Sequence, residues 1–170
     1  MATRIAIMDK GVIQQVGTPD DIYNQPENLF VADFVGAPAM NMVDSDICVK
    51  GKKVTAPITG SALMLNLARY RWRTPAVHGQ KVTIGFRAEH VSSGDKAPGG
   101  AKQAFRLPVQ FVETSGPDAI AFLQFAGALR PIAMRIDPAQ VKKFQVGAIV
   151  PVNLPIEKIN IFDAHTGRRL

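Results

Sequence analysis

The sequence predicts a mainly β fold, either a barrel or a sandwich, that follows a short hairpin and a helical connector. From residue 43 onward, apolar and polar residues alternate with a period of two in many short segments. Turn signals such as Gly51, Gly127 and Gly147 separate these segments. Many short alternating segments at such spacing are typical of barrels and sandwiches.

The turn signals divide this region into a series of expected strands. Residues 60–79 fit a short helix or a strand, and residues 93–103 have little to pack and are expected to form a mobile surface loop. The expected strands cover residues 42–49, 53–58, 81–86, 107–115, 119–126, 130–136, 148–154 and 158–162.

Residues 1–17 are expected to form a β-hairpin. The stretch "RIAIM" is apolar, "DKG" is a turn sequence, and "VIQQV" alternates apolar with polar residues. An isolated hairpin is only marginally stable in water, so this one needs a neighbour. The following twenty residues offer no obvious one.

A helical connector is expected next, over about residues 18–36. Thr18 is a typical N-cap, Pro19 suits the first helical position, and acidic residues follow in the first turn. Pro26 ends this helix. A second short helix lies within "PENLFVADFVGAP", where apolar residues recur at helical spacing before Gly36.

Charge and cysteine content limit the partners and the cellular location expected for this protein. The net charge is +6, but the basic residues form small scattered groups, so nucleic acid is not the expected partner. Cys48 is the single cysteine, which excludes an internal disulfide and fits a reducing compartment. The apolar stretches are too short for a membrane helix, and the first residues lack a secretory signal. A cytoplasmic location is expected.

Catalytic and metal-binding patterns are not evident. A phosphate loop needs glycines ending in Lys and Ser or Thr, and "KGKKVT" lacks that spacing. His78, His90 and His165 stand in turn-like contexts without a nucleophile motif, and are expected to be surface or capping residues. His90 with Glu89 is too sparse for a metal site, as is Cys48 alone. We therefore expect no catalytic, cofactor or metal residue, and no enzyme activity of the chain by itself.

The stretch "RYRWR" alternates Arg69, Arg71 and Arg73 with Tyr70 and Trp72. As a strand it would show a basic face opposite an aromatic one, and such a face can stack nucleic-acid bases. The favoured interpretation is an edge of the barrel, where the aromatic rings point inward and the arginine stems cover apolar surface.

Three motifs resemble a known family in their order and separation. "VGTPDDIY", "FVGAPAMN" and "FRAEHV" occur in this order before the ending "PIEKINIFDAHTGRRL". Across nearly its whole length the chain resembles the C-terminal part of ATP-binding subunits of ABC-class sugar importers, of the maltose and glycerol-3-phosphate type.

The resemblance implies a fold and a division into parts. The fold is an OB-like β-barrel (TOBE/MOP-like) with a short N-terminal hairpin and a helical connector. Residues 1–17 would be the terminal hairpin of the ATP-binding domain, residues 18–41 the connector, and residues 42–170 the regulatory barrel. The core of the ATP-binding domain is not in the sequence, so Met1 would begin a shortened gene or a fragment.

The resemblance also implies partners. The chain would be a non-catalytic regulatory and dimerisation domain that forms a homodimer, while ATP and Mg would bind in the missing domain. Membrane-spanning permease subunits would place it at the inner face of the cell membrane. A regulatory protein or a small ligand would be a further partner.

The cluster in "GFRAEHV" is interpreted as structural. Arg87 and Glu89 are expected to pair as a polar clasp at a barrel corner, with His90 as a turn residue. The family usually has proline where Ala88 stands, so a looser turn is expected here.

Residues Phe34, Gly36, Pro38, Met40 and Asn41 are the expected subunit interface, because apolar side chains surround a tight turn. The alternative is that they only anchor the connector to its own barrel.

Two further functions remain open from the sequence. One is a sensing barrel that holds an oxyanion or a sugar at Ser115, Gly116 and Asp118. The other is single-stranded nucleic-acid binding through an OB-type face that contains the three arginines of "RYRWR".

Overall fold

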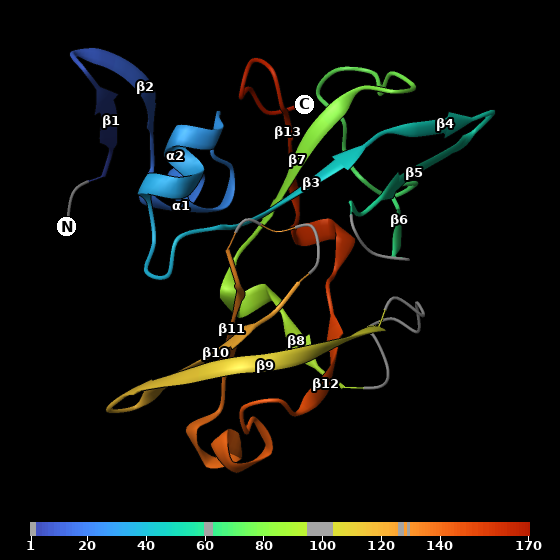
Figure 1. Ribbon diagram of the computed structural model, residues 1–170. Coiled ribbons are helices and arrows are strands. Elements are labelled where there is room, and N and C mark those ends of the chain that lie inside the picture. The colour runs from blue at the N-terminus through green and yellow to red at the C-terminus, as the bar shows by residue number, and fades with distance from the viewer. Residues whose placement is uncertain (1–2, 60–62, 95–103, 126–127, 129) are drawn as a thin grey trace.

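The computed structural model describes residues 3–59, 63–94, 104–125, 128 and 130–170. Figure 1 shows the N-terminal hairpin and two short helices on one side of a larger β structure. The predicted loop at residues 93–103 lies largely outside the described residues, and the predicted strand end at residue 126 lies wholly outside them. None of the helices in the described ranges has the length and apolar character of a membrane span.

The hairpin forms as predicted. Strand β1 (Ile5–Asp9) pairs antiparallel with β2 (Val12–Gly17). Lys10 and Gly11 form the turn with φ values of 47° and 82°. Two successive residues with positive φ match the twist of a two-residue hairpin, and glycine adopts this conformation without steric cost.

One face of the hairpin does have a neighbour, contrary to the sequence-based expectation. Ile7 is buried with Ile22 and Val31 of the connector. The buried side chain of Gln15 donates to the Gln25 carbonyl (3.1 Å) and accepts from the Glu27 amide (2.9 Å). The connector therefore covers the inner face, while the outer face stays apolar and exposed.

The connector contains two helices of six residues each, α1 (Pro19–Asn24) and α2 (Leu29–Phe34). Thr18 caps α1 and forms a reciprocal capping box with Asp21. Asn28 caps α2 through its side-chain oxygen, which accepts from the Val31 amide at 3.0 Å. Helices this short are marginal alone and depend on packing.

The remaining strands form three antiparallel sheets. Within the described residues each sheet has open edges, and the isolated bridge between Ser45 and Ile58 links two of them. The first has the order β13 (Asn160–Asp163), β7 (Lys81–Phe86), β3 (Asn41–Asp46). The second has the order β4 (Cys48–Lys50), β5 (Lys53–Pro57), β6 (Met64–Asn66). The third has the order β11 (Ile132–Ile136), β10 (Asp118–Leu123), β9 (Ala104–Ser115), β12 (Ile149–Asn153), β8 (Ser92–Ser93).

Within the described ranges, three short 3-10 helices connect these strands: η1 (Ala88–His90), η3 (Pro138–Lys143) and η4 (Ile156–Lys158). The strand expected over residues 42–49 is interrupted at Ile47. There the backbone turns to pair with the loop before β7, donating to the Gln80 carbonyl and accepting from the Gly79 amide. In the ambiguous region, residues 64–66 are a strand, and the "RYRWR" segment is irregular rather than a strand.

One apolar core joins all three sheets. Val43 and Ile84 from the first sheet, Leu65 from the second, and Met134 and Val152 from the third belong to the same buried cluster. Strand β7 is buried on both faces, because the first sheet lies between the connector and this core. The end of β7 is therefore the place where connector and core meet.

Asn41 fastens the first sheet to the third. Its side-chain amide donates to the Ala133 carbonyl (2.9 Å), and its oxygen accepts from the Ala133 amide (2.7 Å). Both groups are buried, so removal of the side chain would leave a backbone donor and acceptor unpaired.

We expect Asn41→Ala to lower the free energy of unfolding by about 3 kcal/mol in urea denaturation. Asn66→Ala is the control, because the exposed Asn66 side chain bonds only the local Ala68 amide. Equal losses in the two variants would contradict the role of Asn41.

Candidate functional site

Arg87 occupies the junction between the connector and the sheets. It follows the last residue of β7 and is 1% exposed. Its guanidinium donates to the Tyr23 carbonyl from Nη2 (2.9 Å) and Nε (3.3 Å). Nη1 donates to the Ala32 carbonyl (3.2 Å) and to the Val35 carbonyl. The accepting carbonyls lie at the C-terminal ends of both connector helices.

Tyr23 joins Arg87 to Glu89. The Arg87 guanidinium lies 4.3 Å from the centre of the Tyr23 ring, a cation–π distance. The Tyr23 hydroxyl donates to Glu89 Oε1 at 2.6 Å. Among the described residues, Arg87 and Glu89 form no direct ion pair, in contrast to the prediction, and Tyr23 bridges them instead. The sequence analysis missed Tyr23 because it lies 64 positions from Arg87.

Gly36 lets the connector approach this cation. Its φ is +107°, and a Cβ there would lie 3.0 Å from Arg87 Nη1 and 3.3 Å from the Pro38 carbonyl oxygen. A side chain would disturb both the turn and the guanidinium. Of the predicted interface residues, Gly36 therefore contacts the predicted polar cluster.

The electrostatics of the junction follow from burial. Burial lowers the pKa of Arg87, opposed by the nearby Tyr23 and Glu89, and the guanidinium stays charged. Burial also lowers the pKa of His90, opposed mainly by Glu89, so His90 is neutral at neutral pH. In the described part of the chain, no three His, Cys, Asp or Glu side chains gather at metal-binding distance.

The predicted interface residues divide into two groups. Phe34 is 66% exposed and stacks on Phe30 with ring centres 5.6 Å apart. Pro38, after a cis peptide bond, is half-buried. Met40 is 4% exposed and packs with Ala32 and Phe162, and Asn41 is 7% exposed. Met40 and Asn41 therefore anchor the connector to its own sheets, and the surface that a second chain could contact is at Phe34.

An apolar cavity of about 430 Å³ adjoins this region, lined by Pro38, Met40 and Leu29. The stacked rings of Phe111 and Phe122, with centres 4.4 Å apart, form its far side. The ion pair between Asp33 and Arg130 (3.2 Å) lies at the cavity. No sequence signal connects residues so far apart in the chain.

The turn at Ser115, Gly116 and Asp118 connects β9 and β10. Gly116 has a φ of +58°, and Asp118 pairs with Arg135 of the neighbouring strand at 2.9 Å. The carboxylate would repel an oxyanion, so this turn does not suit the predicted ligand.

The "RYRWR" segment lies beside a second cavity. Tyr70 and Trp72 pack against the core with a ring distance of 4.8 Å, as the favoured interpretation expects, and Arg71 and Arg73 are exposed. His90 lines the same cavity.

We expect Arg87→Met to lower the free energy of unfolding by about 3–5 kcal/mol, since it leaves buried helix-end carbonyls unpaired. Urea denaturation measures the loss. Arg69→Met is the control, because that side chain is 83% exposed, and it should leave stability unchanged. An Arg87→Met variant with an unchanged free energy of unfolding would show that the junction does not depend on the cation.

The junction also predicts a dependence on alkaline pH. Burial, and then the hydrogen bond to Glu89, raise the pKa of Tyr23 above its ordinary value of 10.0. Above pH 10 the unfolded chain loses this proton first, so the stability that the neutral phenol contributes is lost as pH rises. In unfolding experiments from pH 7 to 11, the stability difference between the protein and Tyr23→Phe should shrink with pH. A constant difference would contradict this assignment.

Comparison with curated proteins gives matches over the full chain. The chain is 34% identical over 170 residues to the sn-glycerol-3-phosphate import ATP-binding protein UgpC of Salmonella paratyphi A, and the alignment covers 100% of the chain and 44% of that protein. UgpC of Cereibacter sphaeroides is 34% identical over 171 residues, with 43% of that protein covered. The chain thus spans less than half the length of these relatives. No protein-family model matches.

Among solved structures, the cytoplasmic molybdate-binding protein ModG, determined with molybdate bound, matches with a TM-score of 0.54. The match covers 71% of this chain and 94% of that chain at 17% sequence identity, so the likeness is one of fold. The predicted OB-like fold and the predicted resemblance are confirmed. The whole chain is thus similar to the C-terminal part of sn-glycerol-3-phosphate import ATP-binding proteins, and it has an OB-like fold.

Proposed function

We propose that the chain is the non-catalytic regulatory and association part of an ATP-binding subunit, in an ABC importer of a sugar or related solute. The observation that carries this proposal is the alignment of the entire chain with 44% of an import ATP-binding protein. In this proposal ATP and Mg bind in the remaining part of such a subunit. Permease subunits hold the assembly at the inner face of the membrane.

The exposed face of the hairpin supports this division. Met8 and Ile13 are paired across β1 and β2 and are 54% and 59% exposed. Val16, on the same face, is 44% exposed. A contiguous apolar sheet face is typical of a surface that another domain covers. We assign residues 1–17 to the ATP-binding domain and residues 42–170 to the regulatory domain, joined by the connector at residues 18–41.

The proposed mechanism is mechanical. Association of two such domains keeps their ATP-binding domains close together when these separate during the transport cycle. A regulatory protein or small ligand that binds one spacing of the pair better than another shifts the population of the two states.

The exposed Phe34 offers an association surface. Its ring stacks on Phe30. Two other residues of α2, Leu29 and Asp33, line the apolar cavity together with Phe111 and Phe122. Aromatic side chains at such positions contribute strongly to protein interfaces.

Light scattering coupled to gel filtration over a concentration series tests the association. We expect a concentration-dependent dimer, and Phe34→Glu should weaken it by about tenfold or more because a carboxylate would replace the exposed ring. Val146→Glu is the control. Val146 is 76% exposed and follows η3, away from the connector. A strict monomer at all concentrations, or equal weakening by both substitutions, would contradict an association role at Phe34.

A further inference from the structure

The second cavity gathers basic side chains from three separate parts of the chain. Its volume is about 670 Å³, within the range of small-molecule sites. The "RYRWR" segment forms one wall, the turn η4 and the residues after it another, and the end of the chain a third. The basic residues of the lining are Arg69, Arg71, Arg73, Lys158 and Arg169.

Negative charge neutralises only part of this basic lining. Glu157 lies in the lining and is 3.8 Å from Arg69, and Glu27 pairs with Arg73 at 2.7 Å. Within the described residues, Arg71 and Lys158 have no acidic side chain at ion-pair distance. Even with the carboxyl end of the chain counted, basic groups outnumber acidic groups at the cavity.

Two nitrogens of residues that line the cavity have no hydrogen-bond partner among the described groups. Arg169 Nη1 donates to Asn160 (3.2 Å) and Nη2 to Gln25 (3.4 Å), but the Arg169 Nε is shielded from solvent and bonds no described group. The Nδ1 atom of His90 is likewise shielded and without a described partner. Unpaired buried polar atoms are rare in folded proteins and call for an explanation such as a bound water or ion.

The cavity also has walls for an organic group. Tyr70 and Trp72 present aromatic rings, and Ile156 and Ile159 add aliphatic surface. The Tyr70 hydroxyl is fixed between the Ile161 amide (3.0 Å) and the Leu170 carbonyl (3.3 Å). These contacts hold the aromatic wall in place before any ligand arrives.

We propose that this cavity binds a small phosphate-bearing molecule, with Lys158 and the arginines at the phosphate and Trp72 at the organic part. Guanidinium groups pair with phosphate through two parallel hydrogen bonds. Because cations outnumber carboxylates at the cavity, a doubly charged phosphate gains more than a singly charged carboxylate of the same size. This site is separate from the turn at Asp118 and from the association surface at Phe34, and does not depend on the proposed function.

Trp72 supplies the readout, because it is the single tryptophan of the chain. Its fluorescence and, in parallel, titration calorimetry would be followed at low salt with phenyl phosphate, inorganic phosphate, benzoate and phenol. We expect phenyl phosphate to bind, benzoate to bind about tenfold more weakly, and phenol not to bind. Equal affinities of phenyl phosphate and inorganic phosphate would identify the phosphate group alone as the ligand chemistry. Tighter binding of phenyl phosphate would identify a phosphate ester.

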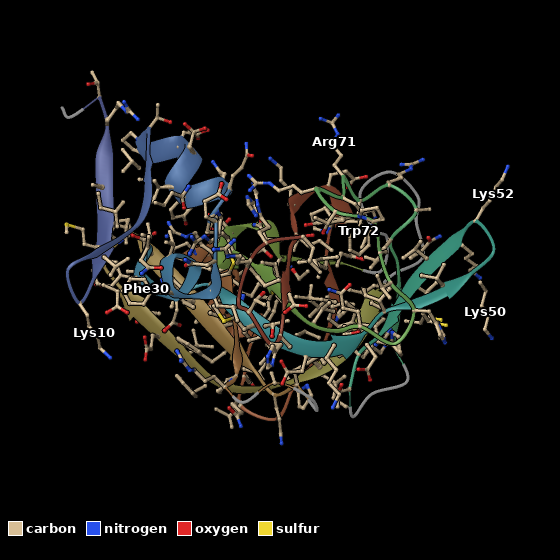
Figure 2. All side chains as sticks on the ribbon, turned by 90° about the horizontal axis from the view of Figure 1, so that it is seen from above. Lys10, Phe30, Lys50, Lys52, Arg71 and Trp72 are labelled. Carbon is tan, nitrogen blue, oxygen red and sulfur yellow. The ribbon has the colours of Figure 1, made fainter. Side chains whose placement is uncertain are left out.

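The test variant carries Arg71→Glu and Lys158→Glu, both on exposed side chains that the fold does not need. The matched control carries Lys50→Glu and Lys52→Glu, with the same change in net charge. Figure 2 shows Lys50 and Lys52 at the tip of the β4–β5 hairpin, away from Arg71 and Trp72. We expect the test variant to lose about tenfold or more in affinity for phenyl phosphate and the control to keep its affinity.

Three outcomes would overturn the proposal. The first is the absence of both heat and fluorescence change with either phosphate. The second is a lack of selectivity, seen either as equal weakening of phenyl phosphate binding in the two charge-reversed variants or as equal affinities for benzoate and phenyl phosphate. The third is tighter binding of a short single-stranded oligonucleotide than of phenyl phosphate, lost in the test variant alone, which would identify a nucleic-acid surface instead.

Discussion

The buried cation of Arg87 holds the N-terminal hairpin and the connector to the sheets. In the part of the chain that the structure describes, no carboxylate pairs with the Arg87 guanidinium, which instead donates to carbonyls at the ends of α1 and α2. Helix C-termini carry partial negative charge, so one cation satisfies two helix ends at once. Six-residue helices have little stability of their own. Their position, and that of the hairpin packed on them, depends on Arg87.

The C-terminal segment strengthens the same junction from the other side. The Leu29 amide donates to the Gly167 carbonyl (2.9 Å), and the Arg169 amide donates to the Glu27 carbonyl (3.0 Å). Asn160 of β13 donates to the Asn24 carbonyl (3.3 Å). Contacts from β7 and from the C-terminal segment thus hold the connector in place.

The two cavities on either side of this junction differ in chemistry. The apolar one, at Phe111 and Phe122, is also lined by Leu29 of α2 and suits contact with another apolar group. The basic one, at Trp72 and Arg169, suits a small anion. His90 follows Glu89 in η1 and lines the basic cavity, and Pro38, two residues after Gly36, lines the apolar cavity. Each cavity is therefore lined by a residue close in sequence to the junction.

The sequence by itself determined the features that depend on near neighbours. The Lys10–Gly11 turn, the capping box of Thr18 and Asp21, and the period-two strands follow from residues within a few positions of one another. The order of three motifs indicated the resemblance to ATP-binding subunits of importers. The ends of β7 were predicted correctly because its alternating apolar run is bounded by turn residues on one side and a charged residue on the other.

Only the tertiary structure decided which side chains meet and which remain exposed. Asn41 forms hydrogen bonds with Ala133, 92 positions away, and Arg87 donates hydrogen bonds to Tyr23, 64 positions away. The local sequence pattern does not encode such pairs. Met40 and Asn41 were therefore expected at a subunit interface, but their side chains are buried within the molecule. The break at Ile47 has the same origin, since a distant loop supplies its hydrogen bonds. Burial is a property of the whole packed molecule, because each side chain is covered by segments that the sequence around it does not contain.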